Sequence, residues 1–96
     1  MNEPERPSSL SAGVSDNRAR KRFELTVDDQ TAVLVYERTA DQLTLIHTEV
    51  PERLRGGGLA TALVEAALER GHAEGLRIVA QCPFVKAYLR KHPERA

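Results

Sequence analysis

One stretch of the 96-residue sequence decides how the chain folds: Val50-Pro51-Glu52-Arg53-Leu54-Arg55-Gly56-Gly57-Gly58-Leu59-Ala60-Thr61. Before this stretch, apolar and polar residues alternate, which is typical of β-strands. After it, apolar residues recur at steps of three and four, which is typical of one face of an amphipathic helix. The stretch therefore predicts a strand that ends near Val50, a glycine-rich loop, and a helix that begins near Leu59.

Three strands are predicted upstream of the loop, at residues 23–27, 32–36 and 43–50. The first alternates apolar and polar side chains, whereas the second is apolar on both faces, as expected of a central strand. Turn residues separate the strands at positions 28–30 and 39–42. These connections are too short for a crossover, so the three strands should form an antiparallel meander.

A helix, a strand and a second helix are predicted downstream of the loop. The apolar stripe of the first helix comprises Leu59, Ala60, Leu63, Val64, Ala67, Leu68 and Gly71. A short buried strand follows at residues 76–80, and a helix from Pro83 to before Pro93 carries Phe84 and Tyr88 on its apolar stripe. Because a helix joins them, the third and fourth strands should be parallel. We therefore predict an α/β fold, with a mixed sheet of three antiparallel strands plus one parallel strand, and two helices.

Composition restricts the classes of protein that fit. Residues 1–20 are rich in Pro and Ser and poor in large apolar groups, so a flexible tail is expected ahead of a domain at residues 21–96. The 14 basic and 14 acidic side chains balance, which argues against a dedicated nucleic-acid-binding protein. The single cysteine excludes an internal disulfide, and no Cys/His spacing predicts a metal site. Without a signal peptide or a membrane-spanning apolar run, a cytoplasmic location away from membranes is expected.

The glycine loop has the properties of an anion-binding site. Glycines adopt backbone conformations closed to other residues and let a ligand approach the main chain closely. The first turn of the following helix offers unpaired N–H groups and a partial positive charge, which favour a phosphate. Arg53 and Arg55 can add guanidinium contacts at the rim. The loop therefore predicts a phosphate or pyrophosphate ligand.

Two common phosphate loops fit this sequence poorly. A Walker loop requires Lys and Ser/Thr after its last glycine, but Leu59 and Ala60 follow Gly58. The dinucleotide fingerprint requires three glycines over six residues, and Thr61 occupies the third position after Gly56 and Gly58. That fingerprint also belongs at the start of a parallel sheet, whereas three meander strands precede the loop here.

A third kind of loop matches. Arg55-Gly56-Gly57-Gly58-Leu59-Ala60 fits the pattern Arg/Gln-x-x-Gly-x-Gly/Ala of the GNAT superfamily of acyl-CoA-dependent acetyltransferases, which residues 22–92 resemble. Two further blocks, residues 47–51 and the segment 82–94 that begins Cys82-Pro83-Phe84, are similar to a small single-domain subgroup of that superfamily. The helices that other members insert between their first two strands have no counterpart in this sequence.

The resemblance implies a site for acetyl-coenzyme A and transfer of an acetyl group to an amine. Main-chain amides of the loop would hold the cofactor's pyrophosphate, and the strand before the loop would pair with its pantetheine arm. The implied cofactor-binding residues are Val50, Arg55, Gly56, Gly57, Gly58, Leu59, Ala60 and Thr61. The missing helices normally cover the acceptor site, so the implied acceptor is a small amine or an amine of a protein or peptide. A dimer could cover the apolar surface left open, so a monomer or a weak homodimer is expected.

Four side chains are candidates for the chemistry: Cys82, Tyr88, His47 and Glu49. Cys82 lies near a helix N-terminus, where the dipole favours a thiolate, and the resemblance implies either a transient acetyl acceptor or a pocket-lining residue. Tyr88 is implied to protonate the departing thiolate, although a core aromatic fits the same position. His47 and Glu49 alternate on one strand face, so either could deprotonate an incoming ammonium, and a structural histidine is the alternative.

Two other functions are compatible with the sequence. The chain could bind acetyl-coenzyme A without useful catalysis, in which case replacing Cys82 or Tyr88 would change nothing. It could instead be an interaction domain whose loop binds a phosphate on another partner, in which case coenzyme A would not stabilise it.

Overall fold

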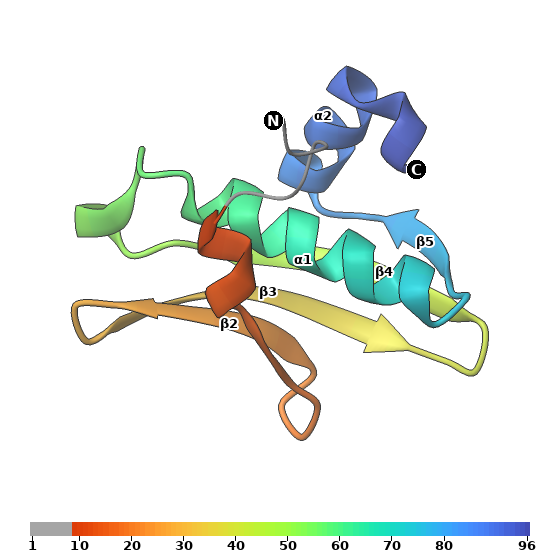
Figure 1. Ribbon diagram of the computed structural model, residues 1–96, viewed down its shortest axis with the longest axis horizontal. Coiled ribbons are helices and arrows are strands. Elements are labelled where there is room, and N and C mark those ends of the chain that lie inside the picture. Colours follow the sequence, from red (N-terminus) through yellow and green to blue (C-terminus); the bar gives the residue numbers. More distant parts are fainter. Residues whose placement is uncertain (1–8) are drawn as a thin grey trace, which may run out of the picture.

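Five strands form one sheet in the computed structural model, which describes residues 9–96. In chain order the elements are η1 (Ser9–Gly13), β1 (Ser15–Asn17), β2 (Arg22–Val27), β3 (Gln30–Arg38), β4 (Gln42–Glu49), η2 (Glu52–Leu54), α1 (Leu59–Ala73), β5 (Arg77–Ala80), α2 (Pro83–Lys91) and η3 (Pro93–Arg95). Strand order in the sheet follows the sequence: β1 to β4 are antiparallel, and β5 is parallel to β4 (Figure 1). The predicted α/β fold with a mixed sheet and two helices is confirmed, and β1 adds a fifth strand at the edge.

The expectation of a flexible tail through residue 20 is wrong for residues 9–20. The 3-10 helix η1 packs against α1, and β1 pairs with β2 in antiparallel register. Leu10 and Val14 are partly buried against the hydrophobic core, so the few apolar residues of this segment find partners from distant parts of the chain. The remainder of the expected tail, residues 1–8, lies outside the described residues.

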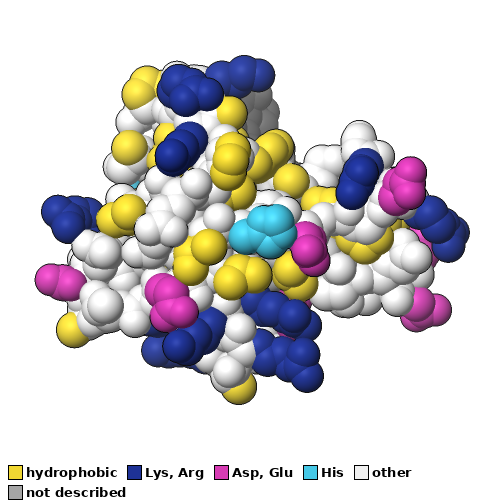
Figure 2. Space-filling view, turned by 180° about the vertical axis from the view of Figure 1, so that it is seen from behind, with side chains coloured by type: hydrophobic (Ala, Val, Ile, Leu, Met, Phe, Trp, Pro, Cys, Tyr) yellow, Lys and Arg dark blue, Asp and Glu magenta, His cyan; other side chains and the backbone are white. Residues whose placement is uncertain are grey.

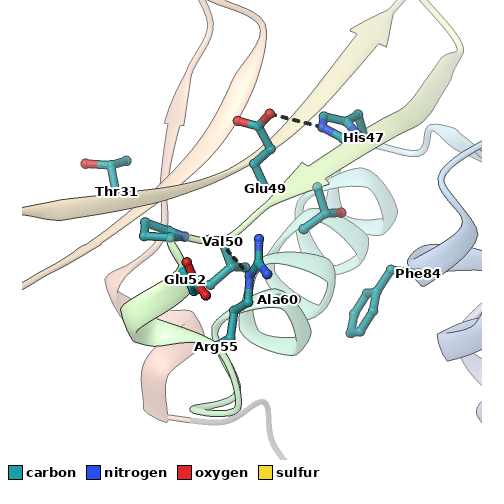
Figure 3. A pocket seen from close by; sticks show the side chains of 10 residues that line it. Thr31, His47, Glu49, Val50, Glu52, Arg55, Ala60 and Phe84 are labelled. Carbon is teal, nitrogen blue, oxygen red and sulfur yellow. Dashed lines mark hydrogen bonds and ion pairs between the residues drawn. The ribbon is translucent and has the colours of Figure 1, made fainter.

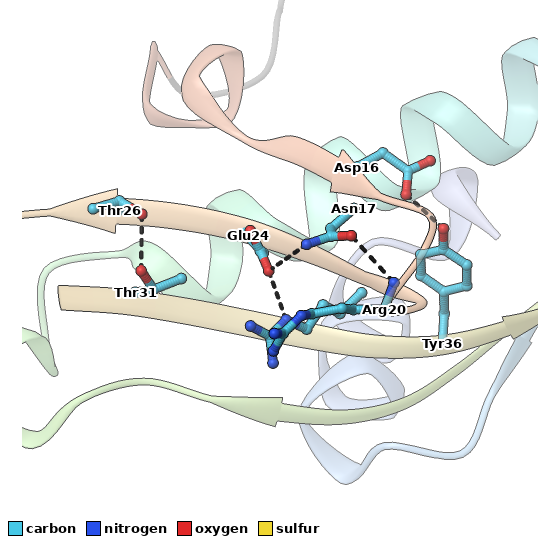
Figure 4. Close-up of polar contacts among 8 residues, drawn as sticks. Asp16, Asn17, Arg20, Glu24, Thr26, Thr31 and Tyr36 are labelled. Carbon is cyan, nitrogen blue, oxygen red and sulfur yellow. Dashed lines mark hydrogen bonds and ion pairs between the residues drawn. The ribbon is translucent and has the colours of Figure 1, made fainter.

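A buried tyrosine ties this N-terminal segment to the centre of the sheet. The Tyr36 hydroxyl, on β3, donates a hydrogen bond of 2.5 Å to Asp16 Oδ1, on β1 (Figure 4). The Tyr36 ring is 1% exposed and packs against Phe23 with a centroid distance of 5.0 Å. Burial, followed by the hydrogen bond to Asp16 and the charge of its carboxylate, raises the pKa of Tyr36 to about 12.

The free energy of unfolding should therefore fall as the pH rises from 10 to about 12. The unfolded chain releases the phenolic proton near pH 10, whereas the folded chain keeps it to about pH 12, so alkali favours unfolding in this window. The expected loss is about 2 kcal/mol. Urea unfolding followed by circular dichroism at several pH values measures it. Tyr36→Phe should be less stable at neutral pH and should lack this alkaline loss; an equal loss in both proteins would contradict the assignment.

The core lies between α1 and one face of the sheet. The predicted stripe of α1 is buried except for Ala60, which is partly exposed. The stripe has a glycine at position 71, where α1 approaches β5 closely. A Cβ there would come within 2.6 Å of Ile78 Cδ1, on β5. No helix of residues 9–96 covers the opposite face of the sheet (Figure 1), where apolar side chains and a histidine lie among charged ones (Figure 2). Within the same residues, no helix is long and apolar enough to cross a membrane.

Candidate functional site

A β-bulge in β4 determines which side chains face the uncovered side of the sheet. Val35 lies opposite His47, but Tyr36 lies opposite Leu45, so Ile46 has no partner on β3. The extra residue shifts the alternation of β4 by one position. Odd-numbered residues of β4 are buried before the bulge and exposed after it. His47 is therefore exposed on the open face although Leu45 is in the core.

His47 and Glu49 lie side by side beyond the bulge, on one face as predicted. Their Nε2 and Oε2 atoms are 3.4 Å apart, and the two side chains are 57% and 72% exposed (Figure 3). Thr48, between them, has a partly buried hydroxyl whose Oγ1 lies 3.2 Å from the Cys82 sulfur. Thr48 was missed from the sequence because strict alternation without a bulge gives no reason to pair it with a residue 34 positions away.

The strands β4 and β5 separate next to this pair. Their ladder ends at Leu45 and Ala80, and the amides of Gln81 and Cys82 both donate to the Leu45 carbonyl, at 2.9 and 3.0 Å. Beyond Leu45, residues 46–49 of β4 continue without β5 beside them. This edge of the strand leaves main-chain donors and acceptors for a ligand to use.

The glycine loop ends directly at the N-terminus of α1. Gly56 and Gly58 have φ values of 83° and 86°, which side chains disfavour and glycine permits. Gly58 is the N-cap residue, and no side chain caps the helix there. Ala62 makes the first helical hydrogen bond, 3.0 Å to the Gly58 carbonyl, so the preceding amides at 59–61 form an uncapped first turn. The loop thus presents main-chain donors at the positive end of the helix dipole.

Two adjoining cavities connect the strand edge to this loop. A cavity of about 590 Å³ is lined by Thr31, His47, Thr48, Glu49, Val50, Pro51, Glu52, Arg55, Ala60 and Phe84 (Figure 3). A cavity of about 270 Å³ is lined by Val50, Leu54, Arg55, Gly56, Gly58, Leu59, Ala60, Thr61 and Phe84. All the predicted cofactor-binding residues except Gly57 line one or both cavities. The structure therefore gathers these residues around one cleft, at whose rim the Arg55 Nε donates 3.2 Å to the Val50 carbonyl.

Phe84 differs from its prediction. It was expected on the buried stripe of α2, but it is 40% exposed, whereas Val85 and Tyr88 are buried. The first turn of α2 begins beyond the end of β5, and the Phe84 ring stands as a wall shared by both cavities and by a third of about 250 Å³. Helical periodicity alone does not distinguish such a wall from a core residue.

Tyr88 lies on the other side of that wall. It lines the third cavity together with Thr61, and its hydroxyl donates 3.3 Å to Glu65 Oε2, on α1. The residue is 8% exposed, and burial, together with the nearby Glu65 carboxylate, raises the pKa of Tyr88. No sequence pattern pairs Glu65 with a tyrosine 23 positions away, so this partner was also missed.

The four predicted catalytic side chains do not form one cluster. His47 and Glu49 contact each other on the uncovered sheet face, and Tyr88 lies beyond Phe84. Cys82 is 3% exposed at the N-cap of α2, behind Thr48. The geometry therefore provides an exposed acid–base pair in the cleft, a phenol in the neighbouring third cavity, and a thiol buried in the core behind Thr48.

Comparison with known proteins shows the family to which the chain belongs. A sequence model described as GCN5-related N-acetyl-transferase matches residues 22–96. The chain belongs to the GCN5-related N-acetyltransferase (GNAT) family. The predicted membership is confirmed, and the glycine motif of this GNAT domain lies at the N-terminus of α1.

Vertebrate relatives agree with the family assignment. The protein NATD1 of Mus musculus is 34% identical, over 91% of this chain and 86% of its own length. The NATD1 proteins of Homo sapiens and Danio rerio are 34% and 30% identical over 83% of this chain, and the match covers 74% and 76% of their lengths. This GNAT protein is therefore similar to NATD1 over most of both chains.

Proposed function

We propose that this chain binds acetyl-coenzyme A in the cleft between the glycine loop and the free edge of β4, and transfers the acetyl group to an amine. One observation carries the proposal. Gly56 and Gly58, both with positive φ, precede an uncapped helix at the point where β5 leaves β4 unpaired. The uncapped helix would bind a diphosphate, and the unpaired strand edge beside it would pair with an extended arm. Coenzyme A has both groups, and the family membership supports the same ligand.

The residues present fit this ligand. Main-chain amides from Gly56 to Thr61 would hold the pyrophosphate, and Arg55 adds positive charge at the rim of the cleft. The edge that ends at Val50 would hydrogen-bond the pantetheine arm. Bound here, acetyl-coenzyme A supplies an acetyl group activated as a thioester.

The exposed His47–Glu49 pair is suited to prepare the amine. An ammonium must lose a proton before its nitrogen has a lone pair for attack on the thioester carbonyl. The His47 imidazole can accept that proton, and the Glu49 carboxylate 3.4 Å away can stabilise the resulting imidazolium. The new N–C bond forms as the C–S bond breaks. The His47 side chain is exposed on the open side of the sheet, where an acceptor amine can approach.

Tyr88 is suited to donate a proton to the released thiolate. Its phenol carries a proton at neutral pH, as an ordinary tyrosine does, and the Glu65 carboxylate 3.3 Å from its oxygen orients the hydroxyl. Cys82 has a structural role in this proposal rather than that of a nucleophile, since its thiol is 3% exposed, contacts Thr48 and packs in the hydrophobic core.

Titration with acetyl-coenzyme A tests the proposal. Amide signals of residues 55–61 in a ¹H–¹⁵N NMR spectrum should shift and saturate, because their N–H groups would bond the pyrophosphate. S-acetylpantetheine, which lacks the diphosphate, is the matched control and should leave these signals in place. A panel of amines should then be screened by mass spectrometry for a product 42 Da heavier, the mass of an added acetyl group.

Three outcomes are distinguishable. Saturable shifts with an acetylated product support the transferase. Saturable shifts without a product, across small amines and peptides, would indicate a binding module instead. The absence of any shift at 55–61 would remove the cofactor site altogether.

A further inference from the structure

A separate cavity of about 280 Å³ lies between the N-terminal segment and α1. Phe23 lines it from β2, Val14 lines it from the N-terminal segment, and Ala66 and Ala73 line it from the C-terminal half of α1. The proposed cofactor site lies at the other end of the same helix, around its first turn. This cavity is therefore outside the acetyl-transfer site.

A buried carboxylate lines this cavity and lacks a full set of partners. The Asp16 side chain is 6% exposed, and its Oδ1 accepts the hydrogen bond from Tyr36. Its Oδ2 is buried and has no hydrogen-bond partner among the described residues (Figure 4). An unsatisfied buried acceptor is costly, and more so when it carries a charge. Asp16 therefore favours an occupant that donates a hydrogen bond.

The nearby arginine does not fill this role. Arg70 Nη1 lies 3.9 Å from Asp16 Oδ2, which is an ion-pair distance but too long for a hydrogen bond. The same nitrogen is 3.5 Å from Glu74 Oε2, so two carboxylates share one guanidinium. Arg70 is also 47% exposed, and its charge is screened by solvent on that side. A donor inside the cavity would supply the hydrogen bond to Asp16 Oδ2 that Arg70 does not make.

We propose that this cavity binds a small organic ammonium ion, whose N–H groups donate to Asp16 Oδ2. Among the residues that line the cavity, two carboxylates, Asp16 and Glu69, are offset by one cation, Arg70, so the lining carries a net negative charge. The lining is mostly polar, but Val14 and Phe23 together with its alanines can contact a short alkyl chain. A bare metal ion fits less well, because no group of three or more His, Cys, Asp or Glu side chains within residues 9–96 could hold one. This site is independent of the proposed acetyl transfer.

The test uses n-butylammonium as the probe and 1-butanol as its neutral counterpart. In the full chain, n-butylammonium should shift the amide signals of Ala12, Val14 and Asp16 saturably, and its methylene protons should give NOEs to Val14 and Phe23. 1-Butanol should do neither. Asp16→Asn should weaken binding about tenfold or more, because a charge-assisted hydrogen bond is lost.

The matched control is Asp29→Asn, which removes the same charge at an exposed turn whose φ of 67° asparagine tolerates. It should bind n-butylammonium as the unmodified chain does. Non-saturable shifts, equal effects of 1-butanol, or equal weakening by both substitutions would overturn the proposal. If Asp16→Asn does not fold, the NOEs in the unmodified chain decide: their absence at saturating probe would also overturn it.

Discussion

Gly58→Leu should weaken the binding of acetyl-coenzyme A about 100-fold or more, because at least two charge-assisted hydrogen bonds to main-chain amides would be lost. Gly58 is the N-cap of α1 with a φ of 86°. If the leucine keeps this positive φ, its side chain lies beside the first-turn amides. If the leucine adopts a negative φ instead, the loop has to move. The fold should survive, since a Cβ here would meet only Leu10 Cδ1, at 3.9 Å.

Gly75→Leu is the control for backbone strain. Gly75 also has a positive φ, 71°, with nothing within 4 Å of an added Cβ, but it lies at the far end of α1. Each substitution should cost about 1–2 kcal/mol of stability from the left-handed conformation. Isothermal titration calorimetry should then detect acetyl-coenzyme A binding to the Gly75 variant only. Equal affinities in the two variants would show that the glycine loop does not hold the cofactor.

Tyr88→Phe should lower kcat for acetyl transfer about 100-fold, the typical effect of losing a general acid. The ring keeps its packing, and only the hydroxyl that donates to Glu65 Oε2 is removed. The KM for acetyl-coenzyme A should change little, because the proton is needed only as the C–S bond breaks. Steady-state rates with an acceptor found in the amine screen provide the measurement.

Two further variants distinguish proton donation by Tyr88 from a covalent route through Cys82. Cys82→Ala removes the buried thiol and should retain most of the activity. Glu65→Gln keeps the size of the partner and should give an intermediate loss, since the phenol is still present but less well oriented. A large loss in Cys82→Ala with none in Tyr88→Phe would indicate that the acetyl group passes through the thiol instead.

The N-terminal segment shows why composition can mislead. Residues 9–20 contain few large apolar groups, and on that basis a flexible tail was expected. In the structure, Leu10 and Val14 pack against the core between α1 and the sheet, and Asp16 accepts a hydrogen bond from Tyr36. A segment that cannot form a core of its own can still order on one that other elements provide.

The cleft shows the same limit at the level of single side chains. His47 and Glu49 were predicted to share a face, and they do, but their exposure depends on the bulge at Ile46. The bulge is visible only in the register between β3 and β4. Likewise, the contact of Thr48 with Cys82 joins residues 34 positions apart.

The sequence by itself determined the order of the strands and α-helices from β2 to α2, the parallel placement of β5, and the glycine loop at the start of α1. These features depend on local periodicity and on the positive φ angles that glycine permits at positions 56 and 58. Both are set by residues close together in the chain, so they do not depend on the tertiary contacts. Only the tertiary structure decided which side chains meet: β1 against β2, Glu65 with Tyr88, and Asp16 in a cavity without a full set of partners. Such contacts depend on how the packed elements are placed relative to one another. Residues that are far apart in the chain share no local sequence pattern from which this placement can be predicted.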